Sequence, residues 1–372
     1  VNKLYSCFTN KIKYDDRDSY CNKRVETSGY LMAILFRQYF TKLVKDMRNS
    51  IMKELNSGPW KNVNNSIDNV INNNNLYKII KSTTIESGLK YGLATGNWGI
   101  KSTNSKVGIA QVLSRLTYNS TLSHLRRVNT PTEKTGKLVA PRKLHNSQWG
   151  IICPTETPEG GSVGLVKNLA IMSYISIGSS TDSVISMLNK MKEVINVNDI
   201  NIEDVYEKVK IFINGTFNYV TEHVKSVYSK LVHAKRTGFI NIYTSVSFNP
   251  DMNEINIYTD SGRCCRPLYI LDNNTLRINK DDVSKIISGK YSFNNLVVKS
   301  LNENLYDMSD YKPKSIAEGC VEYIDSEESH YKLIAMNYTE IKKKKGSYTH
   351  CEIHPSVILG VLASLIPFSN HN

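Results

Sequence analysis

Cysteine is scarce in this chain. Seven cysteines occur among 372 residues, an odd number, and no two of them form a Cys-x-x-Cys pair. Disulfide-rich secreted domains carry cysteines in even numbers, and zinc ribbons need closely spaced pairs. The composition therefore argues against a disulfide scaffold and predicts a reduced, intracellular protein without a metal site of its own.

A hydrophobic segment long enough to cross a membrane is also missing. The longest apolar run, residues 357–368, spans 12 residues, whereas a transmembrane helix needs ~20. No signal peptide is visible in the sequence. We therefore expect a soluble protein with no membrane partner. Because the chain begins with Val1 and stops soon after this apolar run, we also expect an internal fragment of a longer protein.

Acidic residues are nearly absent between residues 90 and 145. The whole chain carries a net charge of +13. This segment contains ten Lys and Arg residues and one acid, Glu133, and therefore contributes +9. Concentrated positive charge attracts polyanions and releases counterions when phosphates bind. We therefore expect a nucleic-acid partner. A solvated basic surface without a ligand is the alternative that composition leaves open.

The basic residues gather around a loop shaped by proline and glycine. Pro131, Gly136 and Pro141 exclude a regular element between residues 129 and 146. Cations on both sides of this loop form the candidate nucleic-acid-binding set: Arg126, Arg127, Lys134, Lys137, Arg142 and Lys143. For the arginine pair a structural role is also open, because cations at the end of a helix interact favourably with the helix dipole.

Two acids follow the basic loop in a proline-stiffened segment, residues 153–160. They are Glu156 and Glu159. One role open to them is to bond backbone N–H groups and neutralise nearby arginines. The other is to orient those arginines or a neighbouring element beside a reacting phosphate. The spacing does not separate these roles.

Helical periodicity is clearest in the first third of the chain. Apolar residues recur every three or four positions over residues 28–55, which predicts a long amphipathic helix capped by Ser28. A second set of apolar residues predicts a helix within residues 108–127. These helices would make up most of the basic part of the chain.

Period-two patterns replace the helical ones after residue 175. Asn214-Gly215 lies between two alternating runs and predicts a hairpin, and the turn at residues 249–251 predicts another. Between the hairpins, residues 221–235 read as a helix. The whole pattern predicts an α+β fold of several domains, with irregularly mixed helices and short antiparallel sheets.

Two motifs resemble metal sites. Asp15, Asp16 and Asp18 surround an arginine, and His350 and His354 flank a cysteine and a glutamate. Neither spacing matches a known ligand pattern, so we expect a salt-bridged turn in the first case and a structural role in the second. A metallohydrolase built on both motifs is the weaker hypothesis.

Several runs resemble one protein family in both residues and order. Together they are similar to the second-largest, β-like subunit of multisubunit DNA-directed RNA polymerases, of the eukaryotic and large-DNA-virus type. The resemblance covers nearly the whole chain. The runs include ATGNWG at 94–99, SHLRR at 123–127, ETPEG at 156–160, GLVKNL at 164–169, TDSGR at 259–263 and HCEIHPS at 350–356.

The resemblance implies a domain order and a place in the enzyme. It implies two fork loops, at residues 97–107 and 129–142, which contact the RNA–DNA hybrid and downstream DNA. It also places Glu156 and Glu159 in the neighbourhood of the active centre. The implied domains are the C-terminal part of the protrusion (1–95), the fork (96–175), two external domains (176–267 and 268–345) and the start of the hybrid-binding domain (346–372).

The same resemblance implies that this chain has no catalytic residues of its own. The partners would be the largest subunit, the other polymerase subunits, the DNA template and the hybrid. Mg²⁺ would be bound mainly by the largest subunit and not by this chain alone. The location would be the nucleus for a cellular enzyme, or the virion and the host cytoplasm or nucleus for a viral one. A stand-alone basic nucleic-acid-binding protein is the alternative.

Overall fold

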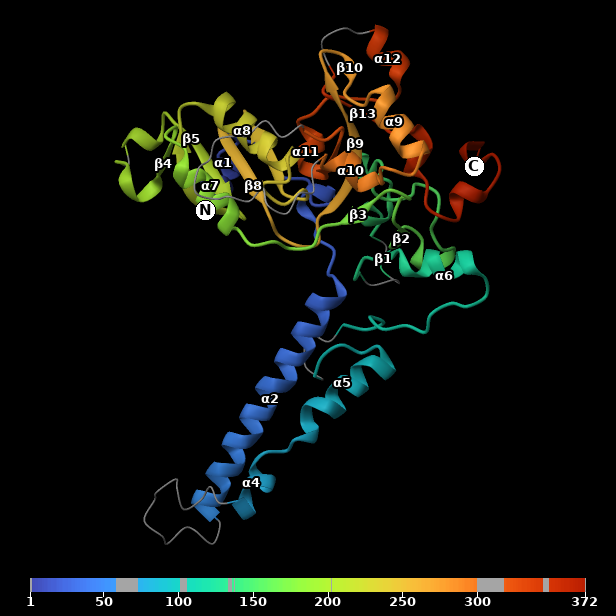
Figure 1. Ribbon diagram of the computed structural model, residues 1–372. Coiled ribbons are helices and arrows are strands. Elements are labelled where there is room, and N and C mark those ends of the chain that lie inside the picture. Colours follow the sequence, from blue (N-terminus) through green and yellow to red (C-terminus); the bar gives the residue numbers. More distant parts are fainter. Residues whose placement is uncertain are drawn as a thin grey trace. The chain divides into compact units, whose positions relative to one another are not determined.

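The chain folds into two compact units. The computed structural model describes residues 2–57, 73–100, 106–132, 136, 138–201, 203–299, 318–343 and 348–371. One unit, here called the helical unit, is Glu26–Thr117; the other, the mixed unit, combines Val1–Val25 with Tyr118–Asn372 (Figure 1). Helices and short sheets alternate along the chain, which confirms the α+β prediction. No helix within the described ranges is both long and apolar enough to cross a membrane.

The helical unit is built on α2 (Ser28–Ser57), with α4 (Asn73–Ile79) and α5 (Thr83–Thr95) following it. The long predicted helix is thus confirmed, although Ser28 is its first helical residue rather than a cap before it. Leu35, Tyr39 and Trp98 form the buried core of the unit. A Cβ at Gly88 of α5 would lie 2.3 Å from the Tyr39 ring, so glycine lets α5 approach α2 closely.

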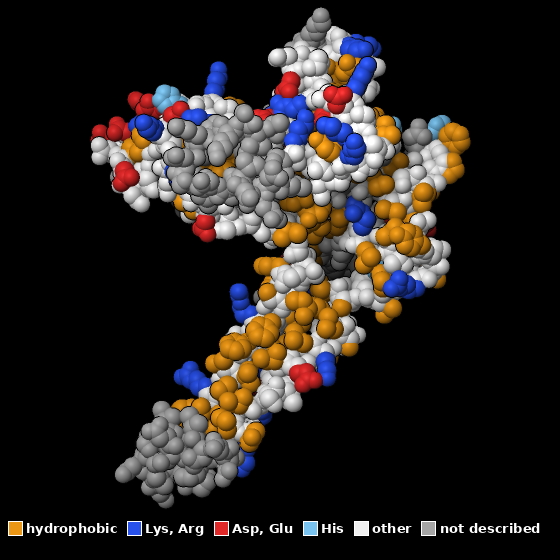
Figure 2. All heavy atoms as spheres, in the orientation of Figure 1, with side chains coloured by type: hydrophobic (Ala, Val, Ile, Leu, Met, Phe, Trp, Pro, Cys, Tyr) orange, Lys and Arg blue, Asp and Glu red, His pale blue; other side chains and the backbone are white. Residues whose placement is uncertain are grey.

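One face of α2 carries an uncovered row of large apolar side chains. The row consists of Met32, Phe36, Phe40 and Val44, which recur every fourth residue and are 36–49% exposed. The rings of Phe36 and Phe40 stack with their centroids 6.0 Å apart. Figure 2 shows hydrophobic side chains along α2. An apolar row of this kind on a helix is typical of a surface that packs against further protein.

The prediction of a helix over residues 108–127 is largely wrong. The helix there, α6, spans only Tyr118–Leu125. Gly108 adopts a positive φ of 75°, and the N–H of Ile109 donates to the carbonyl of Gly96 at 3.1 Å. Ile109 and Ala110 pack against the core of the helical unit. Ile109 and Ala110 therefore belong to an irregular segment, although the apolar spacing of residues 108–127 resembles that of a helix.

A five-stranded sheet forms one part of the mixed unit, in the order β4-β6-β5-β8-β7. Asn214 and Gly215 both have positive φ at the turn between β5 and β6, and β7 pairs antiparallel with β8, so both predicted hairpins are confirmed. α7 (Asp182–Lys190) and α8 (Val224–Arg236) supply apolar side chains to the core under this sheet. α8 confirms the helix predicted between the hairpins. The strands are β4 (Val194–Asn196), β5 (Val209–Ile213), β6 (Thr216–Thr221), β7 (Ser245–Asn249) and β8 (Glu254–Tyr258).

The second sheet is organised around β9 (Cys264–Asp272), which pairs with four other strands. β9 runs through residue 267, where the sequence places a domain limit. The strands around it are β3 (Tyr174–Ile175), β10 (Thr275–Leu276), β11 (Val321–Asp325), β12 (Ile334–Ala335) and β13 (His350–Cys351). The short helices of the unit include α1 (Asn2–Phe8), α9 (Lys280–Ile287), α10 (Phe293–Val297), α11 (Ser326–His330) and α12 (Tyr338–Lys343).

A buried ion network ties the two sheets together. Lys235 of α8 is 2% exposed, and its Nζ lies 2.8 Å from Glu328 Oε2 of α11 and 3.5 Å from Glu322 Oε1 of β11. Burial alone would raise the pKa of Glu322, but Lys332, Arg236 and Lys235 outweigh it and hold the pKa well below its usual range. The cluster is therefore ionised and internally compensated.

Glu327 lies beside this network, and no cation of the described residues is in hydrogen-bond contact with it. Burial first, and then the neighbouring Asp325, raises the pKa of Glu327 to about 7. Its Oε1 accepts hydrogen bonds from Ser247 (3.1 Å) and Asn256 (3.5 Å). The folded protein therefore holds a proton on Glu327 between about pH 4.5 and 7, where the unfolded chain has lost it. Stability is lost as the pH rises through this window.

Replacing Glu327 with glutamine should remove that loss. We expect the variant to match the parent near pH 4.5 and to be about 3 kcal/mol more stable near pH 8, since the pKa rises from 4.5 to about 7 and each pKa unit is worth about 1.4 kcal/mol. Hydrogen-exchange protection of β7 and α11 amides, corrected for intrinsic rates, measures the difference. Glu207→Gln, at an exposed glutamate, is the control. A parallel pH profile for parent and Glu327→Gln would contradict the assignment.

Candidate nucleic-acid interface

A two-stranded ladder holds both ends of the candidate interface. β1 (Arg127–Asn129) pairs antiparallel with β2 (Val166–Asn168), and Arg127 lies opposite Asn168. The basic loop leaves β1, and the acidic segment returns to β2. The N–H of Thr130 donates to the carbonyl of Leu165 at 2.9 Å, which extends the pairing by one step. The loop therefore starts from a fixed base.

Arg126 points into this base. Its Nη2 donates to the carbonyls of Ala170 (2.6 Å) and Ser173 (3.1 Å), with a longer contact to Ile171 (3.3 Å). Burial lowers the pKa of the guanidinium. The side chain thus fastens the segment that follows β2 through Nη2, whereas its Nε is buried and has no hydrogen-bond partner among the described residues.

The Arg142 side chain also binds backbone carbonyls of the protein. Its Nη1 donates to the carbonyls of Gly161 (2.8 Å) and Val163 (2.9 Å). Gly164, with a φ of 69°, sits so close that a Cβ there would lie 2.3 Å from the carbonyl oxygen of Arg142. The end of the basic loop and the turn after the acidic segment are therefore locked to one another.

The other four predicted cations fall into two pairs: two are exposed, and two lie outside the described residues. Arg127 and Lys143 are exposed, and they flank the loop on its two sides. Lys134 and Lys137 lie outside the described residues. The structure thus leaves Arg127 and Lys143 open to solvent, whereas Arg126 and Arg142 bind the protein's own carbonyls.

The two predicted acids also differ from each other. Glu156 accepts a hydrogen bond from the Ser123 hydroxyl at 2.5 Å through Oε1, and its Oε2 is buried next to Gly360, where a Cβ would come within 2.5 Å. Glu159 is exposed and precedes the short helix η4 (Gly160–Ser162) without capping it by its side chain. Glu156 is therefore part of the scaffold, whereas Glu159 is accessible.

The Asp15–Asp18 segment is hydrogen-bonded to this region. Asp16 Oδ2 lies 2.7 Å from His145 Nε2, and the backbone N–H of Asp18 donates to Asp16 Oδ1. The hydrogen bond from Asp18, and then that from His145, lowers the pKa of Asp16. Asp18 pairs loosely with Lys23 at 3.9 Å. Sequence reasoning missed the roles of His145 and Ser123, although Ser123 lies in a run that carries the family resemblance.

The two histidines of the other metal-like motif have separate protein partners. His350 is buried, with Nε2 3.3 Å from Glu322 Oε2, and burial lowers its pKa to about 4. His354 Nδ1 contacts the Ser356 hydroxyl and accepts from its N–H. Across the described part of the chain, no group of three or more His, Cys, Asp or Glu side chains is arranged to hold a metal ion.

Three stretches of the chain match known domain families. Residues 111–175 match RNA polymerase Rpb2, domain 3. Residues 211–272 match domain 4 of Rpb2, and residues 315–355 match domain 5. These three stretches of the chain are thus similar to three domains of RNA polymerase Rpb2. The candidate interface, from α6 to β2, lies wholly within Rpb2 domain 3.

Relatives of known name extend this similarity along the chain. DNA-directed RNA polymerase II subunit 2 of Arabidopsis thaliana is 40% identical over 381 residues, which cover 100% of this chain and 30% of the relative. DNA-directed RNA polymerase subunit Rpo2 of Sulfolobus acidocaldarius is 31% identical, again over 100% of this chain and 30% of its own length. The chain thus spans about 30% of the length of these Rpb2-family relatives.

Proposed function

We propose that this chain is the central part of the second-largest subunit of a DNA-directed RNA polymerase, and that its basic loop contacts DNA and the RNA–DNA hybrid during RNA synthesis. The observation that carries the proposal is the fixed base of the loop. Arg126 and Arg142 secure its two ends to carbonyls, while Arg127 and Lys143 remain exposed beside it. A positively charged loop on a rigid base suits phosphate contacts that position a nucleic acid without reading its sequence.

The proposed roles of the six basic residues divide in two. We assign phosphate contact to Arg127, Lys143, Lys134 and Lys137. Arg126 and Arg142 act as positioning residues, because their guanidinium donors bind backbone. Glu159, exposed at the turn, is the acid that we place nearest the active centre, and Glu156 supports the turn from within.

We propose that the catalytic metal is not held by the described residues of this chain. Nucleotidyl transfer by polymerases uses divalent metal ions held by clustered carboxylates. Glu159 is a single exposed carboxylate, and the described residues contain no suitable cluster. We therefore propose that Mg²⁺ is held mainly by the largest subunit, and that this chain alone is inactive. The partners are that subunit, the other polymerase subunits, the template and the hybrid.

We also propose domain limits for this chain and the type of polymerase to which it belongs. We propose that residues 1–95 belong to a protrusion, 96–175 to a fork, 176–267 and 268–345 to two external domains, and 346–372 to the start of a hybrid-binding domain. The uncovered apolar row on α2 supports a protrusion that is completed by further protein. We also propose the eukaryotic or large-DNA-virus type, acting in the nucleus or, for a virus, in the virion or the host cytoplasm or nucleus.

The test is the salt dependence of nucleic-acid binding by the assembled enzyme. Arg127→Ala combined with Lys143→Ala should lower the slope of log affinity against log salt by roughly 2, because each lost phosphate contact contributes about 0.9. Elongation on a bubble template should slow as the transcription complex becomes less stable. Lys225→Ala, at an exposed lysine of α8, is the control. An unchanged slope would exclude these two cations from the interface.

A further inference from the structure

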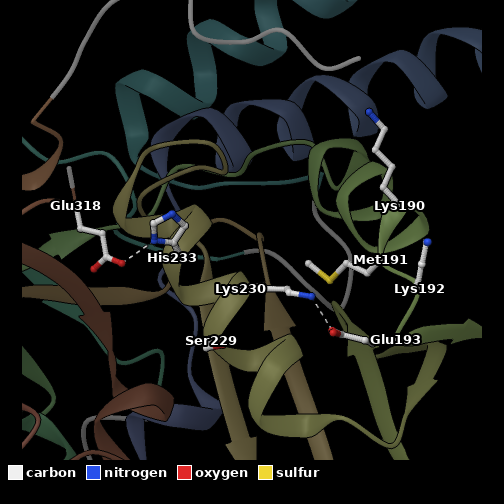
Figure 3. A pocket seen from close by; sticks show the side chains of 8 residues that line it. All are labelled: Lys190, Met191, Lys192, Glu193, Ser229, Lys230, His233 and Glu318. Carbon is white, nitrogen blue, oxygen red and sulfur yellow. Dashed lines mark hydrogen bonds and ion pairs between the residues drawn. The ribbon is translucent and has the colours of Figure 1, made fainter. Parts of the chain in front are cut away.

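A buried lysine of β2, Lys167, differs from the lysines of α8. Lys230 pairs with Glu193 at 2.8 Å, as Figure 3 shows, and Lys235 lies in the buried ion network. Lys167 is 7% exposed, yet it forms no ion pair among the described residues. Burial, and then the nearby Lys23, lowers its pKa. Burying a cation without a carboxylate partner costs free energy, so we asked what the ammonium group contacts.

The Lys167 ammonium donates to the end of the basic loop. Its Nζ lies 3.2 Å from the carbonyl oxygen of Pro141. Pro141 is the middle residue of the short helix η2 (Ala140–Arg142), and it lies two positions before the exposed Lys143. A hydrogen bond from a charged donor is stronger than one between neutral groups. Lys167 thus fixes the backbone close to a cation that we assign to phosphate contact.

The β1–β2 ladder and an aromatic ring hold Lys167 in place. Lys167 lies opposite Val128 in the ladder, and its Nζ is 5.7 Å from the centroid of the Tyr20 ring. A cation within ~6 Å of an aromatic face is attracted to the ring. Tyr20 is 8% exposed and belongs to a core against which Val128 also packs. The ammonium therefore has two favourable contacts, the ring and the Pro141 carbonyl.

The segment that carries Tyr20 is itself bonded to the chain just after the loop. The N–H of Tyr20 donates to the Ser147 hydroxyl at 2.8 Å, and Asp16 Oδ2 lies 2.7 Å from His145 Nε2. The segment therefore holds the end of the basic loop directly, and it also holds that end through Lys167.

We propose that Lys167 is a positioning residue for the basic loop. Its ammonium holds the Pro141 carbonyl and thereby sets where Lys143 meets a phosphate, while Tyr20 keeps the ammonium in place. Because Lys167 is buried, it makes no phosphate contact itself. The proposal rests on the proposed function of the loop and deepens it, since it assigns the placement of a phosphate-binding side chain to a residue that does not touch nucleic acid.

The test uses the assembled polymerase on a bubble template and Lys167→Met, which keeps the length of the side chain and removes the ammonium. Affinity for the template should fall about fivefold in the parent background, but less than about twofold in an enzyme that already carries Lys143→Ala, because residues that act through one another are not additive. Lys23→Met is the matched control. Lys23 Nζ lies 5.8 Å from the centroid of the same ring, but it pairs loosely with Asp18 at 3.9 Å, and its loss should leave the affinity close to that of the parent.

Hydrogen exchange supplies a second readout, which needs no nucleic acid. The N–H groups of Arg142 and Lys143 donate to the carbonyls of Val139 and Ala140, so their exchange reports on the end of the loop. In Lys167→Met these two amides should exchange severalfold faster, whereas amides of α8 should keep the parent rate. Lys23→Met should leave both sets unchanged.

Three results would overturn the proposal. The first is equal exchange of the Arg142 and Lys143 amides in the parent and in Lys167→Met. The second is an equal loss of affinity with and without Lys143→Ala, because Lys167 would then act independently of Lys143. The third is faster exchange throughout α8 as well, which would indicate a general loss of stability. If Lys143→Ala alone leaves the affinity unchanged, the proposed function of the loop fails, and the exchange result still decides whether Lys167 positions it.

Discussion

Replacing Lys235 with methionine should lower the free energy of unfolding of the mixed unit by about 3–5 kcal/mol. Lys235 Nζ lies within 3.5 Å of carboxylate oxygens of both Glu328 and Glu322, and all three side chains are 1–2% exposed. Methionine fills a similar volume but carries no charge. The change therefore removes the cation that donates to the buried Glu328, whose next cation, Lys332, lies 3.8 Å away, and this poorly compensated charge is the source of the loss.

Chemical denaturation of the complete subunit, together with hydrogen exchange of β11 and α11 amides, measures this effect. Lys230→Met is the matched control, because Lys230 lies on the same helix and pairs with Glu193 while 40% of its side chain is exposed. An exposed pair of this kind contributes about 0–1 kcal/mol. Equal losses for the two variants would show that the buried network does not stabilise the fold.

Gly164→Ala should cost about 2–5 kcal/mol and loosen the base of the basic loop. A methyl group at this position would lie 2.3 Å from the carbonyl oxygen of Arg142 and 2.7 Å from its Cα. Alanine is also strained at the φ of 69°. Backbone strain adds about 1–2 kcal/mol and overpacking about 1–3 kcal/mol. Relief requires Arg142 to move, and its hydrogen bonds to Gly161 and Val163 move with it.

Gly160→Ala isolates the contribution of the close approach. Gly160 also has a positive φ, of 76°, but a Cβ there meets nothing within 4 Å. It should therefore cost only the backbone strain, about 1–2 kcal/mol. In the assembled enzyme we expect Gly164→Ala to impair elongation and Gly160→Ala to leave it close to normal. Identical stability and elongation for the two variants would contradict the tight contact between residue 164 and Arg142.

Local chemistry explains which elements were predictable from the sequence. The Asn214-Gly215 turn was predictable because both residues tolerate positive φ. The long helix α2 was predictable from its apolar period. The helix prediction for residues 108–127 failed because Ile109 and Ala110 pack into the core of the helical unit from an irregular segment. The other periodic apolar residues of this segment include Val112 and Leu116, which are exposed, so an apolar period by itself establishes neither a helix nor burial.

The candidate site shows the same division. The basic loop and the acidic turn beside it were predictable, because the charge composition and the positions of proline and glycine can be read directly from the sequence. It did not distinguish Arg126 and Arg142 from Arg127 and Lys143, since the difference lies in which carbonyls the guanidinium groups meet. Glu156 and Glu159 differ likewise through their contacts. Such distinctions depend on neighbours that are tens of residues away along the chain.

The discontinuous mixed unit also constrains how this protein is made. The N–H of Val25 bonds the carbonyl of Gly262 at 2.7 Å, and the N–H of Tyr20 bonds the Ser147 hydroxyl across 127 positions of sequence. Ribosomes add about 5–20 residues per second, so roughly 10–50 s pass between the synthesis of Val25 and that of its partner Gly262. The whole helical unit is synthesised during that interval. The first residues of the chain are therefore an expected client segment for ribosome-associated chaperones.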